Sequence, residues 1–290
     1  MNPSDKDLAK VLAAIGEAAV KIAAVIQTAD LGKVGSTNSS GEEQVALDIL
    51  SDQILQDELK KTELVAAMAS EEMEGVLKME GGRFGVVFDP LDGSSLVDVN
   101  LAVGTIFGVF EGDEFIGKKG RDMVAAGFVV YGPRTTMMIT TGDGVKEYRL
   151  NPDVGWELTH DGLQVGEGKM FAPVNLRAFA ERKYNLELVN WWMNEQYTLR
   201  YSGGMCPDVN QILLKGKGIF SYPGYGDAPN GKLRILFECA PMAFIMEQAG
   251  GAASDGKIAI LDKTIEAIHQ RTPIYIGSKD EVARCEKYLG

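Results

Sequence analysis

The first apolar residues of the chain recur at helical spacing, at positions Leu8, Val11, Leu12, Ile15, Ala19, Ile22 and Ile26. Residues three and four apart share one face of a helix, so this pattern predicts an amphipathic helix that ends before Gly32. A second helix is predicted from Ser40, where Ser40 and Glu43 form a capping pattern ahead of further apolar residues at the same spacing.

Three short apolar runs end in carboxylates. Residues 64–68 lead into Glu71 and Glu72, residues 85–88 end at Asp89, and residues 233–237 end at Glu238. Apolar runs of this length are typical of buried strands. We therefore expect three strands whose C-terminal ends carry acidic side chains.

The rest of the chain mixes strands and helices. Residues 101–150 alternate β-rich runs with glycine turns, residues 219–222 form a further strand-like run, and helices are predicted over 184–196 and after Pro241. This mixture predicts an α+β or layered α/β architecture. The polar, glycine-rich stretch 151–168 is the predicted junction between an N-terminal α+β domain (residues 1–165), which carries most of these carboxylates, and a C-terminal α/β domain (residues 166–290).

Composition narrows the possible functions. The 290 residues contain 45% hydrophobic residues, with 41 acidic residues against 29 basic ones and a net charge of −12. Such a chain can bury a core and lacks the basic surface of a nucleic-acid binder. No apolar stretch reaches about 18 residues, so no membrane span is expected. Two distant histidines and three cysteines without a CxxC pair favour neither a zinc site nor a disulfide framework, and we expect a cytoplasmic protein, or a plastid one whose transit peptide has been removed.

The segment FDPLDGSS at residues 88–95 is the most informative one. Asp89 and Asp92 lie on a turn fixed by Pro90, where both carboxylates can face one cation, and Mg²⁺ or Mn²⁺ prefers such oxygen ligands. Gly93 permits close approach, so the amides of residues 93–95 can hold a phosphate. The alternative is a surface Asp-Pro turn followed by a Gly-Ser loop.

Glu71, Glu72 and Glu238 extend this interpretation. Taken alone, the adjacent Glu71 and Glu72 are best interpreted as a solvated pair of charges. Glu238 taken alone is best interpreted as a carboxylate at the start of a helix. Together with Asp89, these residues suggest a single acidic metal site. A second group consists of cations, namely Arg200, Lys232 and Arg234, and it is accompanied by Tyr201 and Tyr222. These cations are either ordinary surface charges or part of a phosphate-binding pocket. Acidic metal ligands and a separate cationic pocket fit a substrate with two phosphates.

These segments match one family. FDPLDGSS (88–95), SEE (70–72), GSTN (35–38), KLRILFE (232–238), APMAFIMEQAGG (240–251) and IHQR (268–271) resemble the class I fructose-1,6-bisphosphatase and sedoheptulose-1,7-bisphosphatase family. The similarity runs in order along the whole chain. TLRYSGGM (198–205) and EGKMFAP (167–173) are closer to the sedoheptulose branch, whereas Tyr222 and NGKLR (230–234) are closer to the fructose branch. The resemblance implies a layered α-β-α-β-α sandwich of the sugar phosphatase superfamily.

The resemblance also implies roles for individual residues. Two or three Mg²⁺ ions per subunit, which Mn²⁺ can replace, would be bound by Glu42, Glu71, Asp89, Asp92, Glu238 and the carbonyl of Leu91. Glu72 and Asp48 would orient and deprotonate the attacking water. Asp92, Gly93, Ser94 and Ser95 would contact the 1-phosphate or the sugar. Residues of the C-terminal domain would bind the sugar and the distal phosphate, namely Asn175, Arg177, Arg200, Tyr201, Met205, Tyr222, Lys232 and Arg234. Arg177 would compensate for Ala178, which stands where the fructose branch has a tyrosine, and Arg200 would reach in from a neighbouring subunit.

The implied reaction is magnesium-dependent hydrolysis of the 1-phosphate of a ketose bisphosphate. The substrate would be sedoheptulose 1,7-bisphosphate, fructose 1,6-bisphosphate or both, and the products the monophosphate and inorganic phosphate. A homodimer or homotetramer is expected, with no nucleic-acid or membrane partner. Two alternatives stay open: a related lithium-sensitive phosphatase acting on an inositol phosphate or a nucleoside bisphosphate, and a non-catalytic sugar-phosphate-binding regulator.

Overall fold

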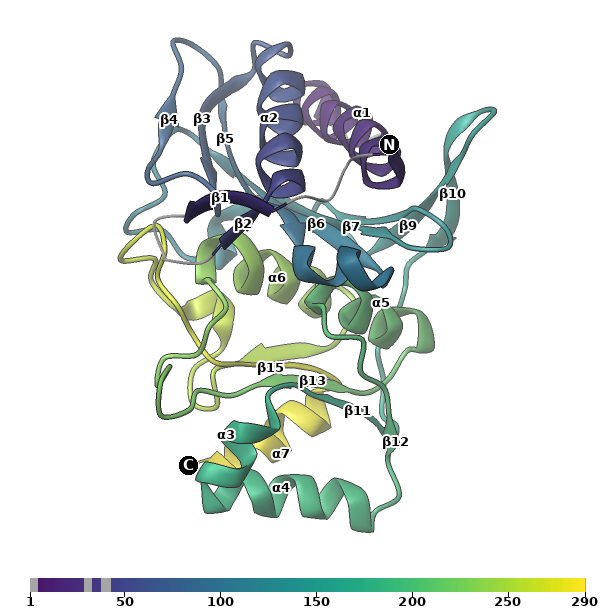
Figure 1. Ribbon diagram of the computed structural model, residues 1–290, viewed down its shortest axis with the longest axis vertical. Coiled ribbons are helices and arrows are strands. Elements are labelled where there is room, and N and C mark those ends of the chain that lie inside the picture. Colours follow the sequence, from purple (N-terminus) through teal and green to yellow (C-terminus); the bar gives the residue numbers. More distant parts are fainter. Residues whose placement is uncertain (1–4, 29–32, 38–42, 290) are drawn as a thin grey trace.

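The chain folds into alternating layers of helices and sheets (Figure 1). The computed structural model describes residues 5–28, 33–37 and 43–289, and for residues 33–37 and 43–46 it describes the backbone alone. From one end to the other, the layers are α1 and α2, a large sheet, α5 and α6, a smaller sheet, and finally α3, α4 and α7. The α-β-α-β-α sandwich implied by the resemblance is thus confirmed.

The first layer follows from the apolar stripe at the start of the sequence. α1 (Lys6–Thr28) buries Leu8, Val11, Leu12, Ile15 and Ile22, and it begins at Asp5, whose Oδ1 accepts the amides of residues 7 and 8 at 3.0 and 3.2 Å. α2 (Ala46–Lys60) packs beside α1 against the same face of the large sheet. The predicted start of the second helix at Ser40 lies outside the described residues, as does Glu42.

The large sheet has eight strands in the order β10-β9-β8-β7-β6-β5-β3-β4. All of its neighbouring strands are antiparallel except β3 and β5, which run parallel. Its members are β3 (Val65–Ser70), β4 (Leu77–Lys78), β5 (Phe84–Asp92), β6 (Val103–Glu111), β7 (Met123–Tyr131), β8 (Thr136–Thr140), β9 (Lys146–Asn151) and β10 (Gly155–Asp161). A separate pair, β1 (Lys33–Thr37) and β2 (Glu43–Val45), precedes α2.

The smaller sheet has five strands in the order β12-β11-β13-β15-β14. They are β11 (Met170–Pro173), β12 (Thr198–Leu199), β13 (Ile219–Tyr222), β14 (Ala252–Ser254) and β15 (Ile274–Gly277). The outer helices are α3 (Leu176–Glu181), α4 (Lys183–Asn194) and α7 (Lys279–Leu289), while α5 (Met205–Lys215) and α6 (Ala240–Gln248) lie between the two sheets. Short helical turns occupy Ser94–Val99, Gly120–Asp122 and Ile260–Asp262.

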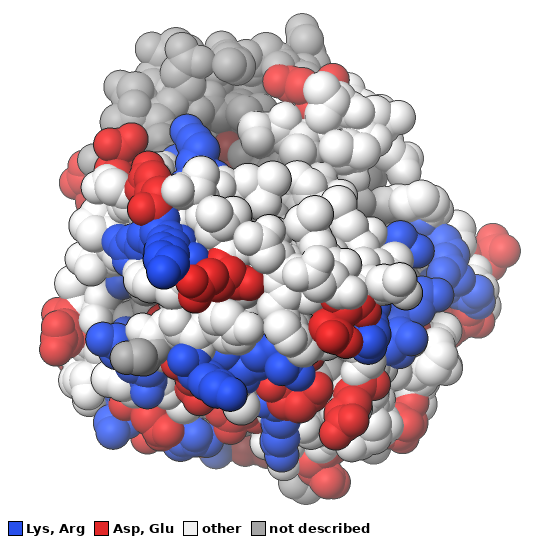
Figure 2. Space-filling model, turned by 90° about the horizontal axis from the view of Figure 1, so that it is seen from below, with Lys and Arg blue, Asp and Glu red and all other residues white. Residues whose placement is uncertain are grey.

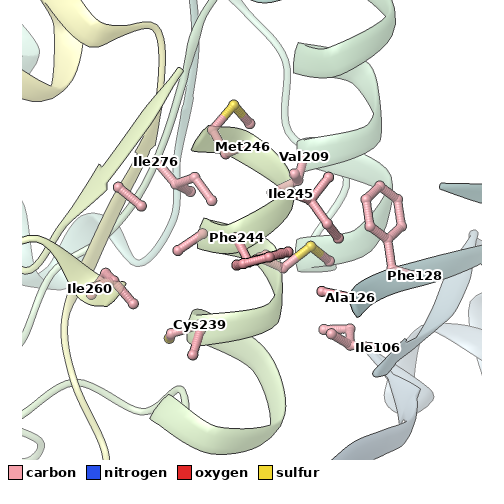
Figure 3. Close-up of a cluster of buried hydrophobic side chains, with 14 of the residues drawn as sticks. Ile106, Ala126, Phe128, Val209, Cys239, Phe244, Ile245, Met246, Ile260 and Ile276 are labelled. Atoms are coloured by element: carbon pink, nitrogen blue, oxygen red, sulfur yellow. The ribbon is translucent and has the colours of Figure 1, made fainter. Parts of the chain in front are cut away.

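α6 is buried from both sides because its sequence is almost entirely apolar. Phe244, Ile245 and Met246 lie between Ile106 and Phe128 of the large sheet and Ile276 of the smaller one (Figure 3). A helix that is apolar all round is stable only when protein covers every face. The two sheets therefore share one core through α6.

Two predicted segments differ from the structure. Residues 233–237, predicted as a strand, contain instead the start of a π-helical turn, Ile235–Cys239, which runs directly into α6. A short apolar run does not distinguish a buried strand from a buried helix. Every residue of this turn is buried, so its sequence shows neither the alternation of a half-exposed strand nor the spacing of a half-exposed helix. Residues 151–168, predicted as a junction, hold the edge strand β10 in their first part. The boundary at residue 165 stays a prediction.

The surface outside the core mixes charges of both signs. On the face seen from below in Figure 1, lysine and arginine side chains lie among aspartates and glutamates, with an uncharged area beside them (Figure 2). Within the described ranges, no helix combines the length and the apolar character needed to cross a membrane.

Candidate metal and phosphate site

Three carboxylates from distant parts of the sequence meet at one end of the large sheet. Glu71, Asp89 and Glu238 each offer an oxygen atom, and these oxygen atoms lie within 4.8 Å of one another. Parallel pairing of β3 with β5 sets Ser70 beside Phe88, and the Glu71 amide donates to the Phe88 carbonyl at 3.1 Å. The sheet register therefore brings Glu71 next to Asp89, as the sequence predicted.

Asp92 joins this group because β5 is irregular at its end. Residues three apart on a regular strand point to opposite faces. The pairing of β5 with β6 shifts between Asp89 and Asp92, across Pro90. The Pro90 carbonyl accepts a hydrogen bond from Thr105 Oγ1 at 2.8 Å, and the Leu91 amide donates to Asp89 Oδ1 at 3.0 Å. The electrostatic effect of Asp92 reaches both Glu71 and Asp89.

The start of α5 holds the Asp92 carboxylate. The amide of Cys206 donates to Asp92 Oδ2 at 2.7 Å, and both residues are buried. Free amides at a helix N-terminus carry partial positive charge and bind anions. Because α5 belongs to the second half of the sequence and Asp92 to the first, this contact joins the two halves at the site.

The turn at Ile235–Cys239 delivers both a carboxylate and a cation. Glu238 Oε2 accepts the backbone amide of Arg234 at 2.6 Å, and the Arg234 guanidinium pairs with Glu71. Both Arg234 and Glu238 are buried. The π-helical turn thus places Arg234 against the acidic cluster, rather than out in a solvent-facing pocket.

The electrostatics of the cluster reflect crowding of like charges. Burial raises the pKa of Glu71 to about 7, with Glu72 and Asp92 adding to the rise and Arg234 opposing it. Burial and the neighbouring carboxylates raise the pKa values of Asp89 and Glu238 well above the usual range. Buried carboxylates in contact resist ionisation unless a cation lies among them.

The donor set fits a divalent metal ion. All of its side-chain ligands are carboxylate oxygens, which hard cations such as Mg²⁺ and Mn²⁺ prefer. A bound cation would offset the repulsion that raises the pKa of Glu71 and Asp89. In the described part of the chain, Glu71, Asp89, Asp92, Glu238 and the Leu91 carbonyl are the predicted ligands; Glu42 lies outside it.

Of the two predicted water-activating residues, Glu72 lies next to this cluster. Asp48 is buried in the first turn of α2. Glu72 is half-buried next to Glu71 and contributes to the raised pKa of that residue. Both positions are compatible with a role beside the metal ligands, which stays a prediction.

The segment after Asp92 has the backbone geometry of an anion cradle. Gly93 has φ +76°, a left-handed conformation that glycine adopts readily, and it begins the turn Ser94–Val99. Ser94 is half-buried and Ser95 is exposed. This turn therefore begins directly after Asp92 and next to the acidic cluster, and phosphate binding by its amides stays a prediction.

Aromatic and cationic residues gather beyond Glu238. Burial raises the pKa of Tyr222 to about 12, and the charges that act on it come from Tyr225, Glu238, Tyr201 and Arg177. The Arg177 guanidinium lies over the Tyr225 ring, 5.4 Å from its centroid. Arg177 and Tyr201 are thus near enough to Tyr222 for their charges to act on it.

The other predicted substrate residues occupy different environments. Asn175 begins α3 with φ +60°, accepts Arg177 Nε at 3.2 Å through Oδ1, and has a buried Nδ2 without a hydrogen-bond partner. Met205 is buried at the start of α5, and Lys232 is half-buried in the loop before Arg234. Arg200 is exposed: its backbone amide donates to the Phe171 carbonyl at 2.9 Å, and its Nη1 donates to the Leu199 carbonyl at 3.1 Å.

Sequence reasoning missed two residues that shape the site. Cys206 supplies the amide that holds Asp92, and Asp208 Oδ1 accepts the Ser202 amide at 3.0 Å, which fixes the loop ahead of α5. A backbone donor leaves no trace in a residue pattern. The Gly203-Gly204 pair directly before a helical pattern was the only available signal of a tight approach.

Comparison with known proteins covers nearly all of this chain. Residues 1–161 match the family model "Fructose-1-6-bisphosphatase, N-terminal domain", and residues 165–290 match the corresponding C-terminal domain model. A class 1 fructose-1,6-bisphosphatase of Trichlorobacter lovleyi is 47% identical over 98% of this chain and 90% of its own length. A chloroplastic sedoheptulose-1,7-bisphosphatase of Triticum aestivum is 46% identical over 98% of this chain and 74% of its own length.

A solved structure agrees with these sequence matches. The holo form of Leishmania major fructose-1,6-bisphosphatase superimposes with a TM-score of 0.94 at 34% identity, covering 98% of this chain and 95% of that one. Identity at this level over whole chains, together with both family models, leaves no part of the fold unmatched. The chain belongs to the fructose-1,6-bisphosphatase family.

Proposed function

We propose that this chain hydrolyses the 1-phosphate of a ketose bisphosphate, namely fructose 1,6-bisphosphate, sedoheptulose 1,7-bisphosphate or both. The observation that carries this proposal is the buried carboxylate cluster Glu71, Asp89 and Glu238 beside the group Arg177, Tyr201 and Tyr222. The first group suits metal-assisted phosphoryl transfer, and the second suits recognition of a second phosphate. Relatives of both named activities match this chain over nearly its whole length.

We infer that the cofactor is magnesium, with two or three ions per subunit and manganese as a substitute. The family relationship and the all-oxygen donor set support this inference. When bound, the cation supplies Lewis-acid polarisation of the phosphoryl group. Glu71, Asp89, Asp92, Glu238 and the Leu91 carbonyl would hold it, with Glu42 as a further proposed ligand.

The chain's own residues would do the rest of the chemistry. Glu72 and Asp48 would orient the attacking water and accept its proton. The amides of residues 93–95 would bind oxygens of the transferred phosphoryl group, and they are preorganised by the left-handed Gly93. Cys206 would keep the Asp92 carboxylate in place through its amide.

The sugar and distal phosphate would lie over the second half of the chain. Tyr201, Tyr222, Arg177 and Lys232 would contact the phosphate, while Asn175 and Met205 would contact the sugar. The buried Nδ2 of Asn175, which has no partner within the protein, supports a polar contact with a ligand. Arg234 would neutralise charge between the phosphate and the metal ligands, since its guanidinium already pairs with Glu71.

The test is phosphate release from four substrates with Mg²⁺, with Mn²⁺ and with EDTA. The substrates are fructose 1,6-bisphosphate, sedoheptulose 1,7-bisphosphate, an inositol monophosphate and a nucleoside 3′,5′-bisphosphate. We expect metal-dependent release from at least one of the two ketose bisphosphates and inhibition by EDTA. Faster release from the inositol or nucleoside substrate would favour the related phosphatases, and binding of a ketose bisphosphate without release would favour a regulator.

We also propose a homodimer or homotetramer in which Arg200 completes a neighbour's active site. Arg200 is exposed and sits beside the exposed Leu199 and Tyr201, which supports a partner at this surface. Light scattering after size-exclusion chromatography would measure the mass. Arg200→Ala should then raise the KM for the bisphosphate, and a monomeric wild-type protein with normal activity would contradict the proposal. A cytoplasmic location stays a prediction.

A further inference from the structure

Arg271 belongs to the segment IHQR, which the proposed reaction does not use. Its side chain lines a cavity of about 550 Å³ in the second half of the chain. The walls come from the loops at 223–230 and 255–263, the start of α4 and the end of α7, beside the C label in Figure 1. None of the carboxylates of the acidic cluster lines this cavity.

The cavity carries an excess of positive charge in a protein whose net charge is −12. Its lining includes four cations, Arg182, Lys257, Lys263 and Arg271, and one carboxylate, Asp255. Asp255 is already paired with Lys263. Among the described residues, the other three cations form no ion pair with a carboxylate, so their charge is available to an anion.

Arginine and lysine in a concave site are typical of phosphate recognition. Arginine offers two parallel donors to phosphate oxygens, and lysine adds a compact charge. Arg182 keeps a defined position because its Nη1 donates to Tyr184 Oη at 2.8 Å, and Tyr184 also lines the cavity. A cation held in place loses less conformational entropy when it binds an anion.

A buried acceptor without a partner indicates that the ligand also carries a donor. Asn185 lines the cavity and is 1% exposed. Its Nδ2 donates to the Ala178 carbonyl at 3.1 Å, whereas its Oδ1 has no hydrogen-bond partner. A buried acceptor left unpaired is costly, and a ligand hydroxyl would satisfy it.

We propose that this cavity binds a small organic phosphate that bears hydroxyl groups. Arg271, Lys257 and Arg182 would hold the phosphate, and Asn185 Oδ1 would accept a hydroxyl. Ligand sites typically enclose about 300–1,000 Å³, so the volume suits a molecule of sugar-phosphate size. Among the described lining residues, Asp255 is the only carboxylate and it is paired with Lys263, so we expect the site to bind its ligand without hydrolysing it.

The cavity shares a loop with the proposed active site. Pro223, Gly224, Pro229 and Asn230 line it, and the same loop leads from Tyr222 to Lys232. If the proposed function holds, an occupied cavity will change the KM for the bisphosphate by fixing this loop. This consequence rests on the proposed function, whereas the binding site itself does not.

The experiment measures binding of two probes to the full chain by calorimetry. The probes are ribose 5-phosphate and inorganic phosphate, titrated into wild type, Arg271→Gln and Lys232→Gln. We expect ribose 5-phosphate to bind more tightly than inorganic phosphate, because its sugar hydroxyls can donate to Asn185 while its phosphate contacts the cations. Arg271→Gln should weaken this binding about tenfold or more, as expected for a lost charged hydrogen bond. Lys232→Gln should reduce only binding at the proposed active site, and binding in the cavity should remain, because Lys232 does not line it.

Matched variants guard against misfolding and against general charge effects. Lys257→Gln changes an exposed residue of the rim and should repeat the effect of Arg271→Gln if that variant does not fold. Lys215→Gln removes an exposed charge elsewhere and should bind like wild type. Absence of binding in the millimolar range, or equal affinity for the two probes, would overturn the proposal. So would a result in which Lys232→Gln loses binding and Arg271→Gln keeps the wild-type affinity. These outcomes are independent of whether the ketose bisphosphates are hydrolysed.

Discussion

At the scale of single residues, Asp92 has two separate tasks. Its Oδ2 accepts the Cys206 amide at 2.7 Å, and its charge acts on Glu71, Asp89 and Glu238. Replacement by asparagine keeps a carbonyl oxygen that can accept the same amide but removes the negative charge. The substitution therefore separates the structural task from metal binding.

Asp92→Asn should lose at least about 100-fold in kcat while remaining folded, because an electrostatic contact at a reacting phosphate is commonly worth this much. Steady-state phosphate release and circular dichroism would measure the two properties. Asp98→Asn, an exposed aspartate of the following turn, is the matched control and should retain wild-type kcat. Turnover near the wild-type value in Asp92→Asn would remove Asp92 from the metal site.

The raised pKa of the buried Asp208 leads us to expect that the free energy of unfolding depends on pH. Burial raises its pKa to about 6, above the value of about 3.9 for an exposed aspartate, and its Oδ2 has no hydrogen-bond partner. Between these values the folded protein holds a proton that the unfolded chain has lost. The contribution of Asp208 to the free energy of unfolding therefore falls as pH rises from about 4 to 6.

Asp208→Asn removes this titration and keeps the acceptor for the Ser202 amide. Relative to wild type, the variant should gain about 3 kcal/mol at pH 7 and close to nothing near pH 4. Urea unfolding from pH 4 to 8 would measure the difference. A constant difference between variant and wild type across this range would show that Asp208 does not titrate within it.

The acidic half of the site was predictable residue by residue, and the cationic half was less so. Glu71, Asp89 and Glu238 each follow an apolar run, so the sequence indicated carboxylates at the ends of buried segments. Arg234 could be recognised as a cation, but its pairing with Glu71 depends on the turn that precedes α6. The Cys206 amide was not predictable, because every residue except proline has one.

At the scale of elements, β6 and α5 approach each other closely behind Asp92. Gly104 on β6 pairs directly with Asp92 on β5. A Cβ atom at Gly104 would lie 2.4 Å from both Cβ and Sγ of Cys206 and 2.5 Å from the Val129 carbonyl oxygen. Real Cβ atoms do not come this close to other atoms, so only glycine lets the start of α5 reach Asp92.

Gly104→Ala should therefore displace Cys206 and break its hydrogen bond to Asp92. We expect a loss of about 1–3 kcal/mol in the free energy of unfolding, as for other overpacked cores, together with a lower kcat. Urea unfolding and steady-state kinetics would measure both. Gly75→Ala is the control, since a Cβ there meets nothing within 4 Å, and it should change neither quantity. A wild-type kcat in Gly104→Ala would show that α5 does not position Asp92.

One of the segments predicted wrongly lies at the site itself. Residues 235–239 form a π-helical turn, although their apolar pattern is typical of a strand. π-Helical turns are rare and occur often at functional sites. Here the turn places the Glu238 carboxylate where it accepts the Arg234 amide at 2.6 Å. Such a geometry follows from tertiary contacts with β5 and β6, which a local pattern does not contain.

At the scale of the whole molecule, the two sheets share one hydrophobic core. α6 packs between them, and the first turn of α5 donates to Asp92 of the large sheet through the Cys206 amide. The alternation of strands and helices predicted a layered fold, and the family resemblance supplied the order of the layers. The predicted domain boundary at residue 165 did not indicate that both sheets pack against α6. A boundary in the sequence gives no information about which elements pack together across it.

The proposed metal site lies where these halves meet. Glu71 and Asp89 come from the large sheet, whereas Glu238 comes from the segment that leads into α6. An ion bound by all three would bind the folded state only, since the unfolded chain does not bring these carboxylates together. Metal binding should therefore stabilise the whole fold through mass action.

Magnesium should raise the midpoint of thermal unfolding, and EDTA should lower it again. At a free concentration of about 100 times the dissociation constant, the gain is about 2.7 kcal/mol. Scanning calorimetry should show one transition that moves as a unit, because Glu71 and Glu238 tie both sheets to the same ion. Glu238→Gln should lose most of the shift, whereas Glu247→Gln, an α6 glutamate outside the cluster, should keep it. Two separate transitions, of which magnesium moves only one, would contradict a site shared by both sheets.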